Sequence, residues 1–256
     1  ILTRLQQAYN KFIDDLQPIN RFEKYVERVL GRSLTSSERP YVQALNTRGA
    51  DVIANQILTR KLVDSSGNVV GNSLKDILKQ LPPGKFVDFE DYLLNKHAIT
   101  RAARGEKVFR DELNWTPEEG ARKVEQYEQQ YPKFKEIADQ LYNFQKEMVN
   151  RWLVETGLIS RETAEQWFEQ NPFYVPNKRY FSELEKTAGT ATRARRGFAD
   201  QSAPVRKYSP TGSQRPIISP IESMIENVDA FVKAAKRNQV MQSLIRNIQR
   251  DPEALA

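Results

Sequence analysis

The chain contains no cysteine, and it has a single histidine, His97, among its 256 residues. Without cysteine there is no disulfide scaffold, thiolate metal site or cysteine nucleophile, and one histidine excludes every site that needs two imidazoles. Apolar residues make up only 39% of the chain, and no apolar run approaches the roughly 18 residues that a membrane-spanning helix needs. We therefore expect no membrane span, no bound metal and no other cofactor.

Motifs of the common enzyme classes are missing as well. The chain has no GxGxxG or GxxxxGKS/T phosphate cradle, no HExxH zinc motif and no GxSxG nucleophile elbow. Carboxylates stand close together at three places, Asp14-Asp15, Asp88-Glu90-Asp91 and Glu118-Glu119. Solvent-facing helix surfaces and helix capping account for such groups, so we name no catalytic residue. A fragment of a nuclease- or protease-like enzyme that uses carboxylates and His97 stays open as an alternative.

Residues 1–175 carry apolar side chains at intervals of three and four, interrupted by proline and glycine, which is typical of consecutive amphipathic helices. The expected helices cover 2–16, 19–30, 36–57, 73–81, 89–104, 117–130, 133–156 and a short stretch after 160. Pro18 and Gly31 end the first two, and Gly49 is a weak point inside the third. The helix over 133–156 would be roughly 36 Å long, which favours side-by-side packing in a bundle.

Two local signals punctuate this helical pattern. Thr116-Pro117-Glu118-Glu119 is a strong helix start, with threonine at the N-cap and proline at the first helical position. The turn-rich residues 64–68 separate Leu62-Val63 from Val69-Val70, the pattern of a minimal β-hairpin. The expected fold class is therefore all-α: an elongated multi-helix bundle with one minimal β-hairpin and a long basic loop before the C-terminal helix. Residues 1–175 would form the helical domain, with the hairpin near 62–70.

The sequence changes character at residues 171–176, where two prolines four residues apart favour an extended chain. We interpret Phe173-Tyr174-Val175 as a packed crossover. Residues 176–218, called the basic segment below, show no sustained periodicity and are far longer than an ordinary connection. Residues 175–218 hold nine basic and three acidic residues, a balance of +6 that equals the formal net charge of the whole chain. The other 30 basic and 30 acidic residues cancel, so the helical scaffold is neutral.

An extended basic segment of this kind is suited to bind the phosphates of nucleic acid. The candidate nucleic-acid-binding residues are Arg193, Arg195, Arg196, Arg206, Lys207 and Arg215. Aromatic residues that could stack on the bases of a single strand are Tyr180, Phe181, Phe198 and Tyr208. Such binding would depend on salt and would be largely indifferent to sequence. The alternatives are a solvated loop and a basic surface that docks onto an acidic protein neighbour.

A second helix start, Ser219-Pro220-Ile221-Glu222, opens the last element. Its apolar stripe comprises Met224, Val228, Phe231, Ala235, Met241, Ile245 and Ile248. A helix continuous to Arg250 would be about 48 Å long, too long to lie wholly within a compact domain of this size. We therefore expect residues 219–256 to pack on another part of the parent chain or on a partner. A helical oligomerisation module is a further alternative.

The order of these features resembles the helical accessory regions of the very large polyvalent, or virion-associated, proteins of bacteriophages and related mobile elements. The similar stretches are Phe12–Ile19, Phe89–Leu94 with Gly105 behind it, Asn171–Arg179, Arg215–Ile221 and Ala234–Asn238. The resemblance implies a non-enzymatic structural or interaction domain of a large phage-type protein, and it carries over no catalytic residue.

The same resemblance implies a setting for the domain. It would lie in the virion, or in the host cytoplasm after delivery, and would be delivered with DNA or act on it. Its partners would be other domains of the same large chain, DNA, portal or core virion proteins, or further copies of itself. The first residue is Ile1 and not methionine, so we expect the chain to be a piece of a longer protein.

Overall fold

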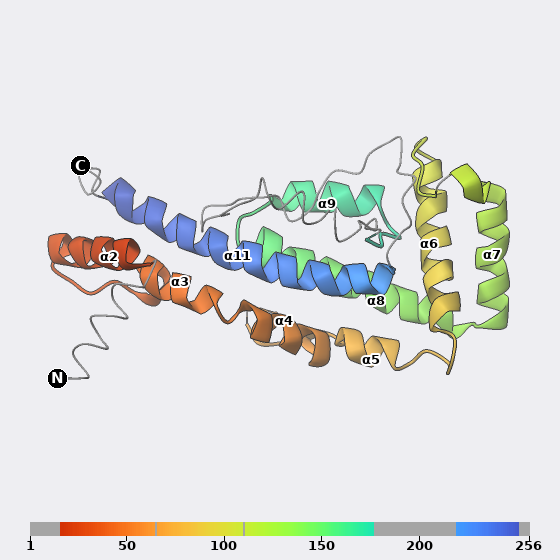
Figure 1. Ribbon diagram of the computed structural model, residues 1–256, viewed down its shortest axis with the longest axis horizontal. Helices are drawn as coiled ribbons and strands as arrows, with labels where there is room; N and C mark the ends of the chain where they lie inside the picture. Colours follow the sequence, from red (N-terminus) through yellow and green to blue (C-terminus); the bar gives the residue numbers. More distant parts are fainter. Residues whose placement is uncertain (1–15, 65, 110, 177–218, 251–256) are drawn as a thin grey trace. The chain divides into compact units, whose positions relative to one another are not determined.

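A computed structural model describes residues 16–64, 66–109, 111–176 and 219–250 (Figure 1). These residues form helices and one two-stranded sheet, which confirms an all-α fold with a single minimal hairpin. The chain divides into two compact units: unit 1 is Ile1–Asp51 with Lys233–Ala256, and unit 2 is Val52–Val232. Both boundaries lie inside helices.

Unit 1 contains α2 (Gln17–Leu30), the 3₁₀ turn η1 (Ser36–Glu38) and α3 (Pro40–Thr47). Two helices have residues in both units, α4 (Ala50–Thr59) and α11 (Pro220–Arg250). Unit 2 contains β1 (Leu62–Val63), β2 (Val69–Gly71), α5 (Leu74–Leu78), α6 (Phe86–Ala102), the 3₁₀ turn η2 (Asp111–Leu113), α7 (Pro117–Gln130), α8 (Lys133–Val149), the π-helical turn η3 (Asn150–Val154) and α9 (Arg161–Gln170). In the part of the chain that is described, no helix is both long and apolar enough to cross a membrane.

Several helix ends are determined by capping side chains or by glycine at the end itself. The hydroxyl of Thr116 accepts a hydrogen bond from the amide of Glu119 at 3.2 Å, which confirms the predicted start of α7. The hydroxyl of Ser160 does the same for Thr163 at 3.1 Å at the start of α9. Gly31 ends α2 in the left-handed conformation, at φ 62°, which glycine adopts at little cost. These ends depend on residues adjacent in sequence, and the sequence therefore predicts them.

Other helix boundaries differ from the prediction. Pro18 lies in the first turn of α2, where its missing N–H is not needed, and α2 begins at Gln17. The residues expected to form a helix before it, apart from Leu16, lie outside the described part of the chain. The helix expected over 36–57 is interrupted: α3 ends in a turn in which the amide of Gly49 donates to Asn46 at 3.2 Å, and α4 begins at Ala50. The weak point at Gly49 is therefore a real break.

The hairpin has the predicted position. Val63 pairs with Val69 in antiparallel orientation, and an irregularity between Leu62 and Val63 shifts the register. The side chain of Asp64 closes the turn, because its Oδ1 accepts hydrogen bonds from the amides of Ser66 and Asn68 at 2.9 and 2.8 Å. These hydrogen bonds hold the pKa of Asp64 below its usual value.

The core of unit 2 is built where α6, α7 and α8 meet (Figure 1). Phe89 and Tyr92 of α6 are fully buried against Phe134 of α8, with ring centroids 5.0 and 5.7 Å from it. Burial of one such aromatic side chain stabilises a fold by roughly 1.5–3 kcal/mol. These aromatic residues of α6 and α8 therefore form part of the core of unit 2.

Gly120 lets α7 approach the indole of Trp115. A Cβ at residue 120 would lie 2.6 Å from Cζ2 of Trp115, and the ring is fixed because its Nε1 donates to Asn95 at 2.8 Å. We predict that Gly120→Ala destabilises the chain by about 1–3 kcal/mol in urea unfolding, despite the better helix propensity of alanine. In a Trp115→Leu background the clash is gone, and the same substitution should stabilise the chain by about 0.5–1 kcal/mol. Equal effects in both backgrounds would contradict the clash.

The apolar stripe predicted for α11 is buried only in part. Met224, Val228, Phe231 and Ala235 are buried as predicted, but Ile245 is 48% exposed. Ser243 and Asn247 are buried on this part of the helix instead. They are tolerated there because both are hydrogen-bonded: Asn247 donates to the carbonyl of Glu38 at 2.8 Å, and Ser243 donates to Val240 at 2.9 Å.

Candidate functional site

The residues on either side of the basic segment are attached to unit 2. The residues after it, at the start of α11, are attached to α6. The carboxylate of Glu90, on α6, accepts hydrogen bonds from the hydroxyl of Ser219 and from the amide of Ile221. Ser219 also caps the helix, because its Oγ accepts from the amide of Glu222 at 3.1 Å. A carboxylate beside a helix N-terminus is favourable, since the unpaired amides there carry partial positive charge. Glu90 therefore fixes the point at which the chain leaves the basic segment.

The other attachment is the crossover, residues 171–175, which leads into the basic segment. Tyr174 packs edge-on against the imidazole of His97, on α6, with 5.6 Å between ring centroids, and against Trp167 of α9 at 4.5 Å. The side-chain amide of Gln145, on α8, donates to the carbonyl of Tyr174 at 2.7 Å, and Val175 is fully buried. The interpretation of these residues as a packed crossover is confirmed.

Cationic side chains of α6 and the loop behind it hold the crossover further. The ammonium of Lys96 lies 4.6 Å from the ring centroid of Phe173, a cation–π contact. Arg104 donates to the carbonyl of Gln170 and, at 2.8 Å, to the side-chain oxygen of Asn171. The crossover is thus anchored by aromatic contacts, a cation–π contact and hydrogen bonds from Gln145 of α8 and Arg104 of the loop after α6.

Both attachments use the same helix. Glu90 and His97 lie seven residues apart on α6, a separation of about 10.5 Å along the helix axis. The two flanks of the basic segment, with Tyr174 before it and Ser219 after it, therefore attach to α6 within two turns of one another. All of these residues belong to unit 2.

The electrostatic surroundings of His97 favour its neutral form. The side chain is only 1% exposed, and burial is the largest cause that lowers its pKa to about 3. The positive charges of Arg101 and Arg104 act in the same direction, and the backbone of Phe173 opposes them. Burial also raises the pKa of Tyr174 to about 12. The contact between these two rings therefore involves two uncharged groups at neutral pH.

The described carboxylates of the three acidic groups have structural explanations. Asp88 pairs with Lys85 at 3.2 Å, and Asp91 accepts from the hydroxyl of Tyr127 at 3.1 Å. Glu118 and Glu119 lie in the first turn of α7, where acidic side chains complement the helix dipole, and Asp14-Asp15 lies outside the described residues. Within residues 16–64, 66–109, 111–176 and 219–250, no group of three or more acidic or histidine side chains is placed to hold a metal ion.

The predicted nucleic-acid-binding residues, Arg193, Arg195, Arg196, Arg206, Lys207 and Arg215, all lie outside the described residues. The structure describes the crossover and the start of α11, which flank the segment that contains them. Sequence reasoning missed Glu90 as an attachment, because it lies within an acidic cluster that looks solvent-facing. The signal for the other attachment was present in the aromatic residues between two prolines.

Comparison of the chain with protein-family models, with curated proteins and with solved structures finds no match. Its function is therefore inferred from its own residues.

Proposed function

We propose that this chain is a non-enzymatic helical scaffold that presents the basic segment to nucleic acid, as an interaction domain of a large phage-type protein. The observation that carries the proposal is the attachment of both flanks of that segment to one helix, α6. A basic segment held at two neighbouring points can contact a nucleic acid strand while the scaffold beneath it stays folded.

The distribution of charge supports the same proposal. The residues outside 175–218 carry equal numbers of basic and acidic side chains, so the whole balance of +6 belongs to the held segment and Val175. Acidic groups of the scaffold are used internally, as in the contacts of Glu90, Asp91 and Asp88. Polyanion binding through phosphates is the interaction that such a charge distribution favours.

The setting is part of the proposal and comes from the resemblance described above. The domain would be virion-associated, would be delivered with DNA or act on it, and would contact further domains of its parent chain or portal and core proteins. The support for this setting is the order of the sequence features and the helical fold.

The test is the salt dependence of binding to single-stranded DNA, measured by fluorescence anisotropy. In the triple variant Arg193→Ala, Arg195→Ala and Arg196→Ala, the slope of log Kd against log salt concentration should fall by about 2, because each phosphate contact on a single strand contributes about 0.7. Wild-type binding should weaken steeply between low and physiological salt.

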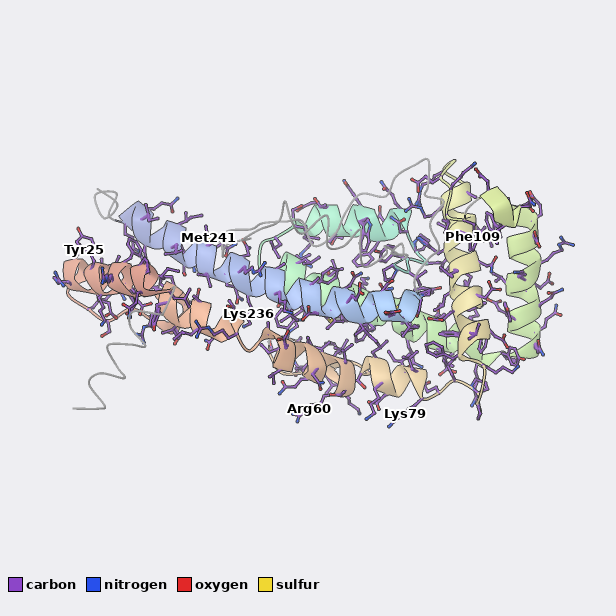
Figure 2. All side chains as sticks on the ribbon, in the orientation of Figure 1. Tyr25, Arg60, Lys79, Phe109, Lys236 and Met241 are labelled. Carbon is purple, nitrogen blue, oxygen red and sulfur yellow. The ribbon has the colours of Figure 1, made fainter. Side chains whose placement is uncertain are left out.

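The matched control removes the same charge from the scaffold of unit 2. Arg60, Lys75 and Lys79 are exposed there, and Figure 2 labels the first and last of them. Their triple alanine variant should keep the wild-type slope. An unchanged slope in the arginine triple variant, or an equal decrease of the slope in both triple variants, would contradict the proposal. Turnover of DNA or peptide with Mg²⁺ that is lost in an Asp91→Asn variant would overturn its non-enzymatic part.

A further inference from the structure

A cavity of about 300 Å³ lies between α8, α9 and the crossover, within unit 2. Its aromatic walls come from one residue of each element, Tyr142, Phe168 and Tyr174. Its polar lining includes Asn143, Gln145 and Lys146, all on α8. The volume is at the lower end of the range for small-ligand sites, so it suits a single ring system better than a large cofactor.

The walls of this cavity are held in place without a ligand. Gln145 donates to the carbonyl of Tyr174 at 2.7 Å, which joins α8 to the crossover. Asn171 donates from its side chain to the carbonyl of Trp167 at 2.9 Å, which joins the crossover to α9. The ring of Tyr142 packs against Phe173 at 5.8 Å between centroids. Such a preformed site loses little freedom when a ligand binds.

The chemistry of the lining matches a nucleobase. Aromatic rings offer stacking surfaces that every base can use, and side-chain amides can hydrogen-bond to base edges. Lys146 is exposed and forms no ion pair with any carboxylate of the described residues, so its ammonium is available for a phosphate. The crossover that forms one wall leads directly into the basic segment, which would bring a strand to the cavity.

We infer that this cavity takes one unstacked base of a single-stranded nucleic acid, with Lys146 at the adjoining phosphate. The inference rests on the proposed function and deepens it: the basic segment supplies sequence-independent attraction, and the cavity supplies a contact that requires a base. The ligand class is a nucleotide within a strand.

The test compares a base-bearing DNA strand with a strand of equal length that carries abasic sites. Phe168→Ala should reduce the preference for the base-bearing strand at least about fivefold, since base–aromatic stacking is worth about 1–3 kcal/mol per base. Phe109→Ala is the matched control, because Phe109, labelled in Figure 2, is half-buried in the same unit, packs on Trp115 and does not line the cavity. This control should keep the wild-type preference.

A second variant tests the phosphate contact without touching the core. Lys146→Gln should lower the salt slope by about 0.7, as expected for one phosphate contact. Lys135→Gln, an exposed position on the same helix, should leave the slope unchanged. Because Lys146 is exposed, its variant is expected to fold, and circular dichroism checks this for every variant.

The failures of the two proposals are distinguishable. If the arginine triple variant flattens the salt slope but Phe168→Ala and Lys146→Gln behave like their controls, the cavity inference is overturned and the proposed function stands. If Phe168→Ala weakens binding of the abasic strand as much as that of the base-bearing strand, stacking is also overturned. If no variant and no wild-type protein binds DNA, both proposals fail.

Discussion

Arg39→Met is expected to destabilise unit 1 by about 3 kcal/mol, because it leaves a buried carboxylate without its cation. Glu23 is only 2% exposed, and its Oε1 accepts from Nε of Arg39 at 2.8 Å. Its Oε2 accepts from the amide of Tyr41 at 3.0 Å, where α3 begins. After the substitution, the carboxylate keeps only the amide, which does not compensate for a charge taken out of water.

The converse variant should be much milder. Arg39 is 42% exposed, so removal of Glu23 leaves a cation that water can solvate. The double variant Glu23→Leu with Arg39→Met should recover most of the loss, since replacing both partners by apolar groups is often neutral. Amide hydrogen exchange of peptides from α2 and α3 measures the effect within unit 1. As a control, Arg32→Met breaks an exposed ion pair with Glu38 in the same unit and should change exchange far less. A double variant as unstable as Arg39→Met would contradict the explanation.

Features that depend on neighbours in sequence were predictable. The starts of α7 and α9 follow from Thr116 and Ser160, whose hydroxyls bond amides three residues later. The hairpin follows from a turn that Asp64 closes with its own side chain. Pro18 shows the limit of such signals: a proline is compatible with the first turn of a helix and incompatible with its interior, so the residue alone does not say whether a helix ends or begins.

Features that depend on distant contacts were not predictable. Glu90 meets Ser219 across 129 positions, and nothing near Glu90 in the sequence distinguishes it from a solvent-facing acid. Asn247 is buried and donates to the carbonyl of Glu38, 209 positions away, whereas Ile245 is exposed against the apolar pattern. The apolar periodicity of a sequence identifies the buried face of a helix only where the buried side chains are apolar.

Helix α6 combines both kinds of feature. Its aromatic residues Phe89 and Tyr92 are fully buried in the core of unit 2. Its charged and polar residues Glu90, Lys96 and His97 face partners on other elements, and they hold both flanks of the basic segment. A helix used on all sides in this way has no clear apolar face, so its importance for the candidate site is not visible in its hydropathy pattern.

The burial of His97 makes the stability of unit 2 depend on pH. His97 has a pKa of about 3 in the folded chain and 6.5 as an unperturbed group. Between these values the unfolded chain binds a proton that the folded chain does not, so stability rises with pH in this window. The stabilisation is complete above about pH 6.5 and should fall by up to about 1.4 kcal/mol per pH unit below it, which is about 2 kcal/mol at pH 5.

Urea unfolding at pH 7.5 and pH 5.0, followed by tryptophan fluorescence, measures this loss. All three tryptophans, Trp115, Trp152 and Trp167, lie in unit 2 and report on it. His97→Leu removes the only imidazole of the chain, so the difference between the two pH values should shrink by about 2 kcal/mol in the variant. Carboxylates titrate equally in both proteins and cancel in this comparison. An undiminished difference, or an imidazole that titrates near pH 6.5 in the folded chain by NMR, would show that the crossover does not bury His97 in solution.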